Sequence, residues 1–129
     1  MDQNVKLTFS QIRYIIWLYR LSSGGQGVKN VELANALGFS KPSVHYMLKS
    51  LIDAGAVRQE SFGLAFLTEE GNALAQKYAV SYCHLEKKMS EICGGTLSEN
   101  AICTVLADMP LEKIDELGNE KMSERRFEI

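Results

Sequence analysis

Residues 31–51, VELANALGFSKPSVHYMLKSL, constrain the fold more than any other stretch of this 129-residue chain. They predict two short helices joined by a three-residue turn. The first begins near Asn30, a good N-cap residue, and has an apolar face made by Leu33, Ala34 and Leu37. Gly38 follows where a helix end favours a residue that adopts positive φ. Pro42 falls in the first turn of the next helix, where its missing N–H does no harm. The stretch is therefore typical of a helix-turn-helix unit.

The second helix of this unit has two different faces. Its N-cap is expected at Ser40 or Lys41, and Gly55 is expected to stop it. An apolar face with helical spacing is predicted to pack inward, through Val44, Leu48, Leu51 and Ile52. The opposite face carries short polar side chains, an aromatic ring and a cation: Ser43, His45, Tyr46, Lys49 and Ser50. We expect this second face to project into solvent.

A short β-hairpin is predicted directly after the helix-turn-helix unit. In AVRQESFGLAFLT, residues alternate between the two sides of each half of the segment, and Gly63 marks the bend. A helix-turn-helix followed by a hairpin is the winged-helix arrangement. The expected fold class is thus mainly α with a small β-hairpin wing.

Further helices are expected on both sides of this unit. One runs from about Ser10 to Leu21, because Thr8 and Gln11 have capping-box spacing. A long helix is predicted from Glu69 to Cys93 with Thr68 as its cap, another starts at Ser98 and Glu99, and Pro110 makes a corner before LEKIDEL. We expect a winged helix-turn-helix domain over residues 1–68 and a helical dimerisation domain over 69–129, ending in a frayed charged tail.

An apolar stripe along the long helix has two interpretations. It runs through Leu74, Tyr78, Tyr82, Leu85, Met89 and Ile92. It forms either core within one chain or the self-complementary face of a two-fold dimer. Because a rear segment of about sixty residues buries little core of its own, we expect both, with homodimerisation.

Bulk composition favours a cytoplasmic protein of ordinary globular type. Apolar runs are too short to span a bilayer, no secretory signal opens the chain, and three cysteines without CxxC spacing predict reduced thiols. The formal net charge is −2, but residues 1–68 carry 7 − 4 = +3 and residues 69–129 carry 7 − 12 = −5. No nucleotide loop, carboxylate pair or nucleophile–histidine arrangement indicates an enzyme.

Double-stranded DNA is the expected partner, because a helix with one packed face can place its other face in the major groove. The candidate contacts are Ser40, Lys41, Pro42, Ser43, His45, Tyr46 and Lys49, with Arg58 at the base of the wing. Glu60 near the wing tip would be repelled by phosphate. Two alternatives compete with this interpretation: an ordinary solvated helix face, and a winged-helix module that binds a protein.

From Asn30 to about Leu111 the chain resembles the iron- and manganese-dependent repressors of the DtxR/MntR type. The resemblance rests on ELANALGFSKPSVHYMLKSLIDAGAV, GLAFLTEEG and SYCHLEKKMSEICG. It implies a homodimer that is built through the helices after the wing and acts as a repressor on a palindromic operator. It also implies the short, two-domain kind, which has no SH3-like third domain.

The metal site that this resemblance implies is incomplete in the sequence. His84 and Cys103 fall on ligand positions, but Leu106 and Ala107 stand where a glutamate and a histidine are expected. Arg13 and Ile16 occupy the first-helix ligand positions. Two such ligands without a carboxylate do not make a manganese or iron site, so no cofactor is expected.

Three interpretations of these positions stay open. In the first, Cys103 is an ordinary buried thiol and His84 is a hydrogen-bonded side chain. In the second, the two residues hold zinc or copper with help from Cys83. In the third, Arg13 takes the place of a metal by pairing with an acidic residue and so links the first helix to the dimerisation segment.

Overall fold

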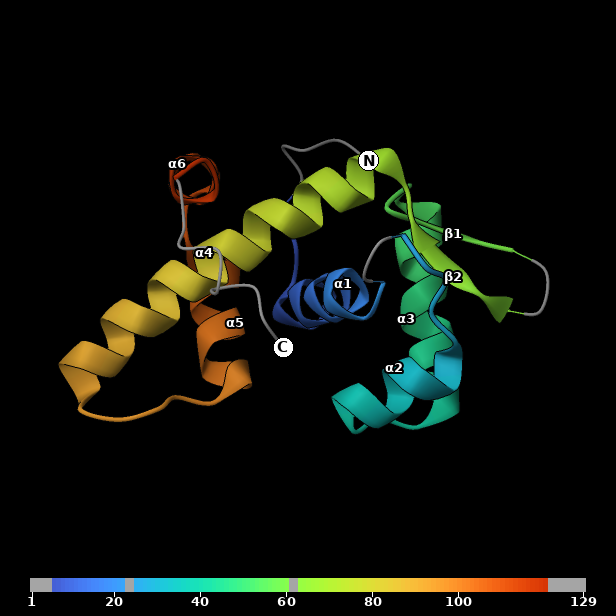
Figure 1. The fold of residues 1–129 in the computed structure, drawn as a ribbon, viewed down its shortest axis with the longest axis horizontal. Coiled ribbons are helices and arrows are strands. Elements are labelled where there is room, and N and C mark those ends of the chain that lie inside the picture. Colours follow the sequence, from blue (N-terminus) through green and yellow to red (C-terminus); the bar gives the residue numbers. More distant parts are fainter. Residues whose placement is uncertain (1–5, 23–24, 61–62, 121–129) are drawn as a thin grey trace.

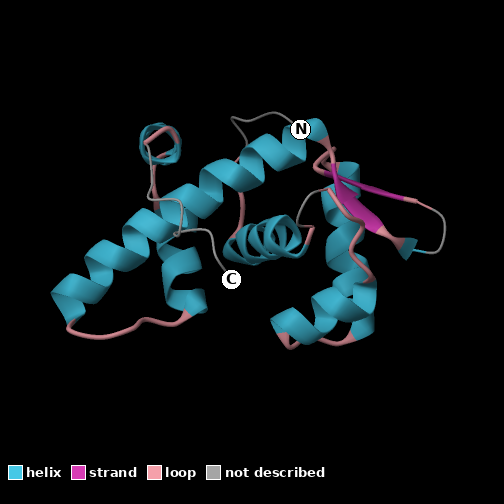
Figure 2. Ribbon diagram, in the orientation of Figure 1, coloured by secondary structure: helices cyan, strands magenta, loops and turns pink. Residues whose placement is uncertain are grey.

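The computed structural model describes residues 6–22, 25–60 and 63–120 of the chain. Within these ranges the fold contains six helices and one two-stranded antiparallel sheet (Figures 1 and 2). The elements in order are α1 (Phe9–Leu21), α2 (Asn30–Leu37), α3 (Lys41–Asp53), β1 (Val57–Gln59), β2 (Ala65–Leu67), α4 (Glu69–Cys93), α5 (Glu99–Asp108) and α6 (Leu111–Gly118). The expected mainly helical fold with a hairpin wing is confirmed.

Side-chain hydroxyls begin most of the helices, as the sequence predicts. Thr8 and Gln11 form a capping box at the start of α1. The hydroxyls of Ser40, Thr68 and Ser98 accept hydrogen bonds from backbone N–H groups in the first turns of α3, α4 and α5. These caps satisfy N–H groups that a helix start would otherwise leave unpaired.

The prediction that Asn30 caps α2 is wrong. Lys29 is the N-cap, Asn30 is the first helical residue, and no side-chain hydrogen bond caps this end. The Asn30 side chain instead faces the wing, where its Oδ1 accepts from Nε2 of Gln59 at 3.4 Å. The side chain that the local sequence pattern assigned to the helix cap therefore makes a hydrogen bond to a residue distant in sequence.

The wing is tied to the segment before α2 through β2. β1 pairs with β2 in the register Val57↔Leu67 and Gln59↔Ala65. Ala65 also exchanges two backbone hydrogen bonds of 2.9 Å with Val28, in the segment before α2. Gly63 has φ of 75°, as expected for the bend, whereas Ser61 and Phe62 of the predicted tip lie outside the described residues.

Helix α1 lies at the centre of the molecule. In Figure 1 it lies between α2, α3 and the hairpin on one side and α5 on the other, and α4 runs past it from the hairpin toward α5 and α6. Its apolar residues Ile12, Ile15 and Leu18 are completely buried, and it packs against α2, α3, α4 and α5. One helix therefore joins the helix-turn-helix to the rear helices.

The start of α4 meets the chain before β1 at backbone distance. A Cβ built on Gly71 would lie 1.9 Å from the carbonyl oxygen of Ala56. The Thr68 hydroxyl also donates to the carbonyl of Gly55 at 2.7 Å. This close approach fixes where the long helix leaves the wing.

No helix in the described ranges is long and apolar enough to cross a bilayer.

Candidate nucleic-acid interface

The predicted outer face of α3 is exposed in the structure. Val44, Leu48 and Leu51 are buried against the rest of the domain. The exposed positions are Ser40, Lys41, Pro42, Ser43, His45, Tyr46, Lys49 and Ser50. Tyr46 has 73% of its surface accessible, and the His45 ring lies edge-on to it with ring centroids 6.1 Å apart. The helix thus presents one ridge of hydroxyls, aromatic rings and two lysines.

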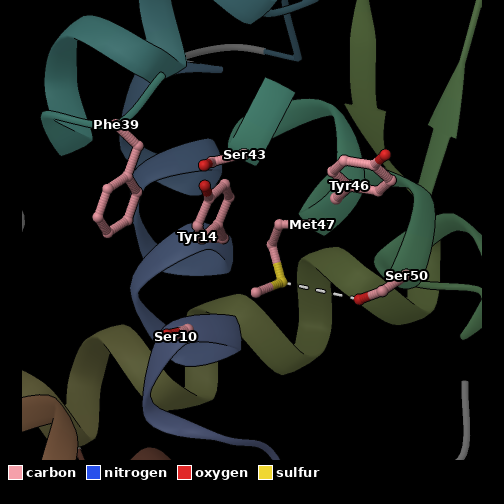
Figure 3. Close-up of a pocket in the computed structure, with 7 residues that line it drawn as sticks. All are labelled: Ser10, Tyr14, Phe39, Ser43, Tyr46, Met47 and Ser50. Carbon is pink, nitrogen blue, oxygen red and sulfur yellow. Dashed lines mark hydrogen bonds between the residues drawn. The ribbon is translucent and has the colours of Figure 1, made fainter. Parts of the chain in front are cut away.

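A hollow of about 440 Å³ runs along one side of this ridge (Figure 3). It lies between α1, the turn before α3 and α3 itself, and its lining contains no charged side chain. The lining residues are Ser10, Tyr14, Phe39, Ser43, Tyr46, Met47 and Ser50. Tyr14 and Phe39 stack with centroids 6.1 Å apart, and the Ser50 hydroxyl donates to the Met47 sulfur at 3.7 Å. Ser10 of α1 thereby joins the surface that α3 presents.

Arg58 is engaged within the wing. Its guanidinium forms an ion pair with Glu60 on the same strand end and lies 4.4 Å from the centroid of the Phe66 ring. About half of each charged side chain is still exposed to solvent. The wing therefore presents a neutralised pair, and its net attraction for phosphate is smaller than that of Lys41 and Lys49.

Arg13 pairs with an acidic residue, as one of the three interpretations of its position proposes. The partner is Glu99 in the first turn of α5, whose Oε1 accepts from Arg13 Nε at 2.9 Å. The same oxygen accepts from the indole Nε1 of Trp17 at 2.8 Å. Arg20 NH1 lies 3.7 Å from the other oxygen, Oε2. Three side chains of α1 thus converge on one carboxylate of α5.

This cluster does not fit a divalent metal. Cys103 is completely buried beside it, and burial, together with the Glu99 carboxylate, raises the pKa of its thiol to about 12. A neutral thiol is a poor metal ligand, and the nearby carboxylate already serves two cations and an indole. Arg13 and Arg20 would also repel an incoming cation.

His84, the other candidate ligand, has a different neighbour. Its Nε2 lies 3.3 Å from Oε2 of Glu120, although the alignment is not that of a hydrogen bond. In the described residues, no group of three or more histidine, cysteine, aspartate or glutamate side chains is arranged to hold a metal ion. His84 and Cys103 therefore belong to no such group among the described residues.

The residues predicted for a dimer interface divide into two groups. Leu74, Tyr78 and Tyr82 are buried within the single chain, packed among the helices around α4. Leu85 and Met89 are only partly buried at the edge of that core. Beyond them Ile92 is 83% exposed. The stripe is thus intrachain core in its first half and accessible in its second.

The sequence did not predict Glu99, Trp17 or Ser10 as site residues. A signal for the first two was present, because Arg13, Trp17 and Arg20 follow at spacings of four and three and so share one face of α1. Such a cationic face requires an acidic partner when it is partly buried. The sequence did not indicate which of sixteen acidic residues would supply it.

One protein-family model matches the sequence. It describes the IclR helix-turn-helix domain and covers residues 18–61, which is about a third of the chain. The matched region runs from the second half of α1 through α2 and α3 to the first half of the wing. A comparison with curated proteins found no match.

Solved structures share the fold. ScaR, with bound Zn²⁺, is 23% identical with a TM-score of 0.59, over 83% of this chain and 52% of its own. The manganese regulator SloR is 22% identical with a TM-score of 0.64, over 82% of this chain and 52% of its own. The hypothetical protein SSo2273 from Sulfolobus solfataricus is 22% identical with a TM-score of 0.57, over 88% of both chains. The chain thus spans about half the length of ScaR and SloR, and identities this low establish the fold alone.

These findings define a class of protein. The chain contains a helix-turn-helix domain over residues 18–61, and its fold is shared by solved transcription regulators. Within that class, the resemblance to metal-dependent repressors is confirmed at the level of the fold.

Proposed function

We propose that the protein represses transcription as a homodimer that places α3 of each protomer in the major groove of a palindromic operator. The observation that carries the proposal is the exposed ridge of α3. Its inner face is held by Val44, Leu48 and Leu51, so its outer face meets DNA without rearrangement.

The side chains on the ridge divide between two kinds of DNA contact. Ser43 and Tyr46 lie centrally and are positioned for base edges and thymine methyl groups. Lys41 and Lys49, at the start of the helix and two turns on, are positioned for phosphates, together with the Ser40 hydroxyl. We extend this surface to Ser10, because its side chain lines the same hollow. The Arg58–Glu60 pair makes the wing a minor contributor.

The dimer is proposed to form through the second half of α4. Leu85 and Met89 continue the apolar stripe at the edge of the chain's own core, and Ile92 beyond them is largely exposed. A two-fold dimer matches a palindrome with half-sites about one helical turn apart. The proposed domain boundary at residue 68 separates the wing from this element, and the cytoplasm is the proposed location.

ScaR binds Zn²⁺ in its solved structure and SloR is a manganese regulator. In this chain, the side chains around Cys103 and His84 do not favour metal binding. We therefore propose that DNA binding needs no divalent ion. Affinity measured by fluorescence anisotropy before and after chelation tests this directly, beside elemental analysis of the purified protein. Binding that a chelator abolishes, or about one metal ion per chain, would reinstate a metal-dependent regulator.

The DNA contacts can be tested with the DNA upstream of the protein's own gene. Lys49→Ala should weaken binding to all duplexes and reduce the slope of log K against log salt by about 0.9, the effect of one lost phosphate contact. Tyr46→Ala should instead reduce the preference for operator over unrelated DNA, by up to about 1–3 kcal/mol for one base contact. Lys113→Ala, at an exposed lysine of α6 outside both the ridge and the proposed dimer interface, is the control and should change neither.

Two outcomes would contradict the proposal. Binding that does not depend on salt would show that phosphates are not contacted. If the protein bound no duplex, while Tyr46→Ala abolished capture of a protein partner, the ridge would belong to a protein-interaction module instead.

A further inference from the structure

The contact between Glu99 and α1 joins the helix-turn-helix side of the molecule to the rear helices through one carboxylate. Oε1 accepts from both Arg13 Nε and Trp17 Nε1, and Oε2 faces Arg20. The side chains of Arg13, Arg20 and Glu99 are only 12%, 22% and 25% exposed. Charged hydrogen bonds screened from solvent to this degree are stronger than exposed ones. Glu99 therefore fixes α1 against α5 at a defined rotation.

Arg13 also contacts the turn that precedes α3. Its guanidinium lies 5.4 Å from the centroid of the Phe39 ring, and Phe39 in turn stacks on Tyr14 of α1. The next residue, Ser40, is the N-cap of α3. An unbroken series of contacts thus runs from α5 through Arg13 and Phe39 to the first residue of the ridge. Because of these contacts, the orientation of α1 on α5 also sets the orientation of α3 relative to the rear helices.

Arg20 adds a second attachment on the same face of α1. Its guanidinium lies 5.1 Å from the Trp17 ring and 5.4 Å from the Tyr82 ring of α4. Trp17 is the only tryptophan in the chain. The partly buried indole therefore lies among the groups that make the contact, and its fluorescence reports on their state.

From this geometry we infer that Glu99 is a positioning residue: by holding Arg13 and Trp17, it sets the angle at which α3 projects from the rear helices and so allows two protomers to reach two half-sites together. The effect on DNA rests on the proposed function. The effect on α1 and α5 does not.

Loss of the carboxylate should affect the two kinds of DNA site differently. Binding to a single half-site uses only the ridge of α3, which Glu99 does not touch. Binding to the second half-site depends on the effective concentration of the second ridge, which falls when its orientation is no longer fixed. A merely destabilising change would instead lower both affinities together.

The experiment compares Glu99→Gln with Glu112→Gln, an exposed glutamate in the first turn of α6 that loses the same charge. Two readouts are taken. Acrylamide quenching of Trp17 fluorescence, with hydrogen exchange of α1 and α5, measures the contact without DNA. Fluorescence anisotropy measures affinity for the two-half-site operator and for the same duplex with one half scrambled.

We expect Glu99→Gln to increase quenching of Trp17 and exchange in α1 and α5. Affinity for the intact operator should fall about tenfold, as for the loss of about 1.4 kcal/mol of charged hydrogen bonding. Affinity for the single half-site should stay within about twofold of the wild type. Arg13→Gln should give the same pattern, and the double variant should be little worse than either single one, because all three remove one interaction.

Unchanged quenching and exchange in Glu99→Gln and Arg13→Gln would overturn the inference. Equal losses of affinity for the intact operator and the single half-site would also overturn it. If the wild-type protein bound no DNA, the proposed function would fail. Loosening of α1 from α5 would then still support the positioning role, and its absence would still refute it.

Discussion

Gly71→Ala should destabilise the protein, although alanine is the better helix former. The new Cβ would lie 1.9 Å from the carbonyl oxygen of Ala56 and 2.7 Å from its carbonyl carbon. Ordinary C···O contacts begin near 3.3 Å, so α4 and this strand start must separate by about 1.4 Å. Both atoms belong to the backbone, and no side-chain rotation relieves the overlap.

The separation acts on two hydrogen bonds at the same junction. Thr68 N–H donates to Ala56 O at 3.0 Å, and the Thr68 hydroxyl donates to Gly55 O at 2.7 Å. Losing both costs about 2 kcal/mol, and overpacking adds about 1–3 kcal/mol. The greater helix propensity of alanine returns at most about 1 kcal/mol. The net expectation is a free energy of unfolding lower by about 2–4 kcal/mol.

Urea unfolding followed by far-UV circular dichroism measures this difference. Gly95→Ala is the matched control, because a Cβ there meets nothing within 4 Å and its φ is not positive. The control should stay within about 0.5 kcal/mol of the wild type. A Gly71→Ala variant as stable as the wild type, or more stable, would refute the argument that this junction is in backbone contact.

Two further predictions follow from the exposed stripe and the buried thiol. Ile92→Lys should shift the protein from dimer to monomer in analytical ultracentrifugation without lowering its stability as a single chain, since this side chain is 83% exposed there; a dimer that persists would exclude this part of α4. The free energy of unfolding should fall as pH rises from about 9 to about 12. Burial raises the pKa of Cys103 from 9.0 to about 12 and the pKa of Tyr82 from 10.0 to about 12. The unfolded chain therefore loses these protons at lower pH than the folded chain does. Denaturation curves at pH 8 and 10.5 measure the fall, which should be smaller in Cys103→Ala, and a pH-independent stability would contradict it.

The helix-turn-helix could be predicted because its signals are local. Gly38 needs a positive φ, Ser40 caps α3, and Val44, Leu48 and Leu51 recur at the helical period. Each of these depends on neighbours within about one or two turns. The pattern therefore determined both where α3 lies in the sequence and which of its faces is exposed.

The contacts that could not be predicted join residues far apart in sequence. Asn30 faces Gln59, Val28 pairs with Ala65, and Arg13 meets Glu99. Periodicity shows that a side chain needs a partner but does not identify it. For the same reason it left open whether Tyr78 lies in core or interface, since both environments select the same apolar stripe.

The central position of α1 has a consequence for synthesis. Arg13 and Trp17 are made early, yet the carboxylate that satisfies them is 86 and 82 residues further along the chain. At about 5–20 residues per second, translation leaves this face of α1 uncovered for several seconds. A nascent chain that has completed α3 still lacks the α5 support for α1, so we expect the DNA-binding surface to reach its final rigidity only after α5 has left the ribosome.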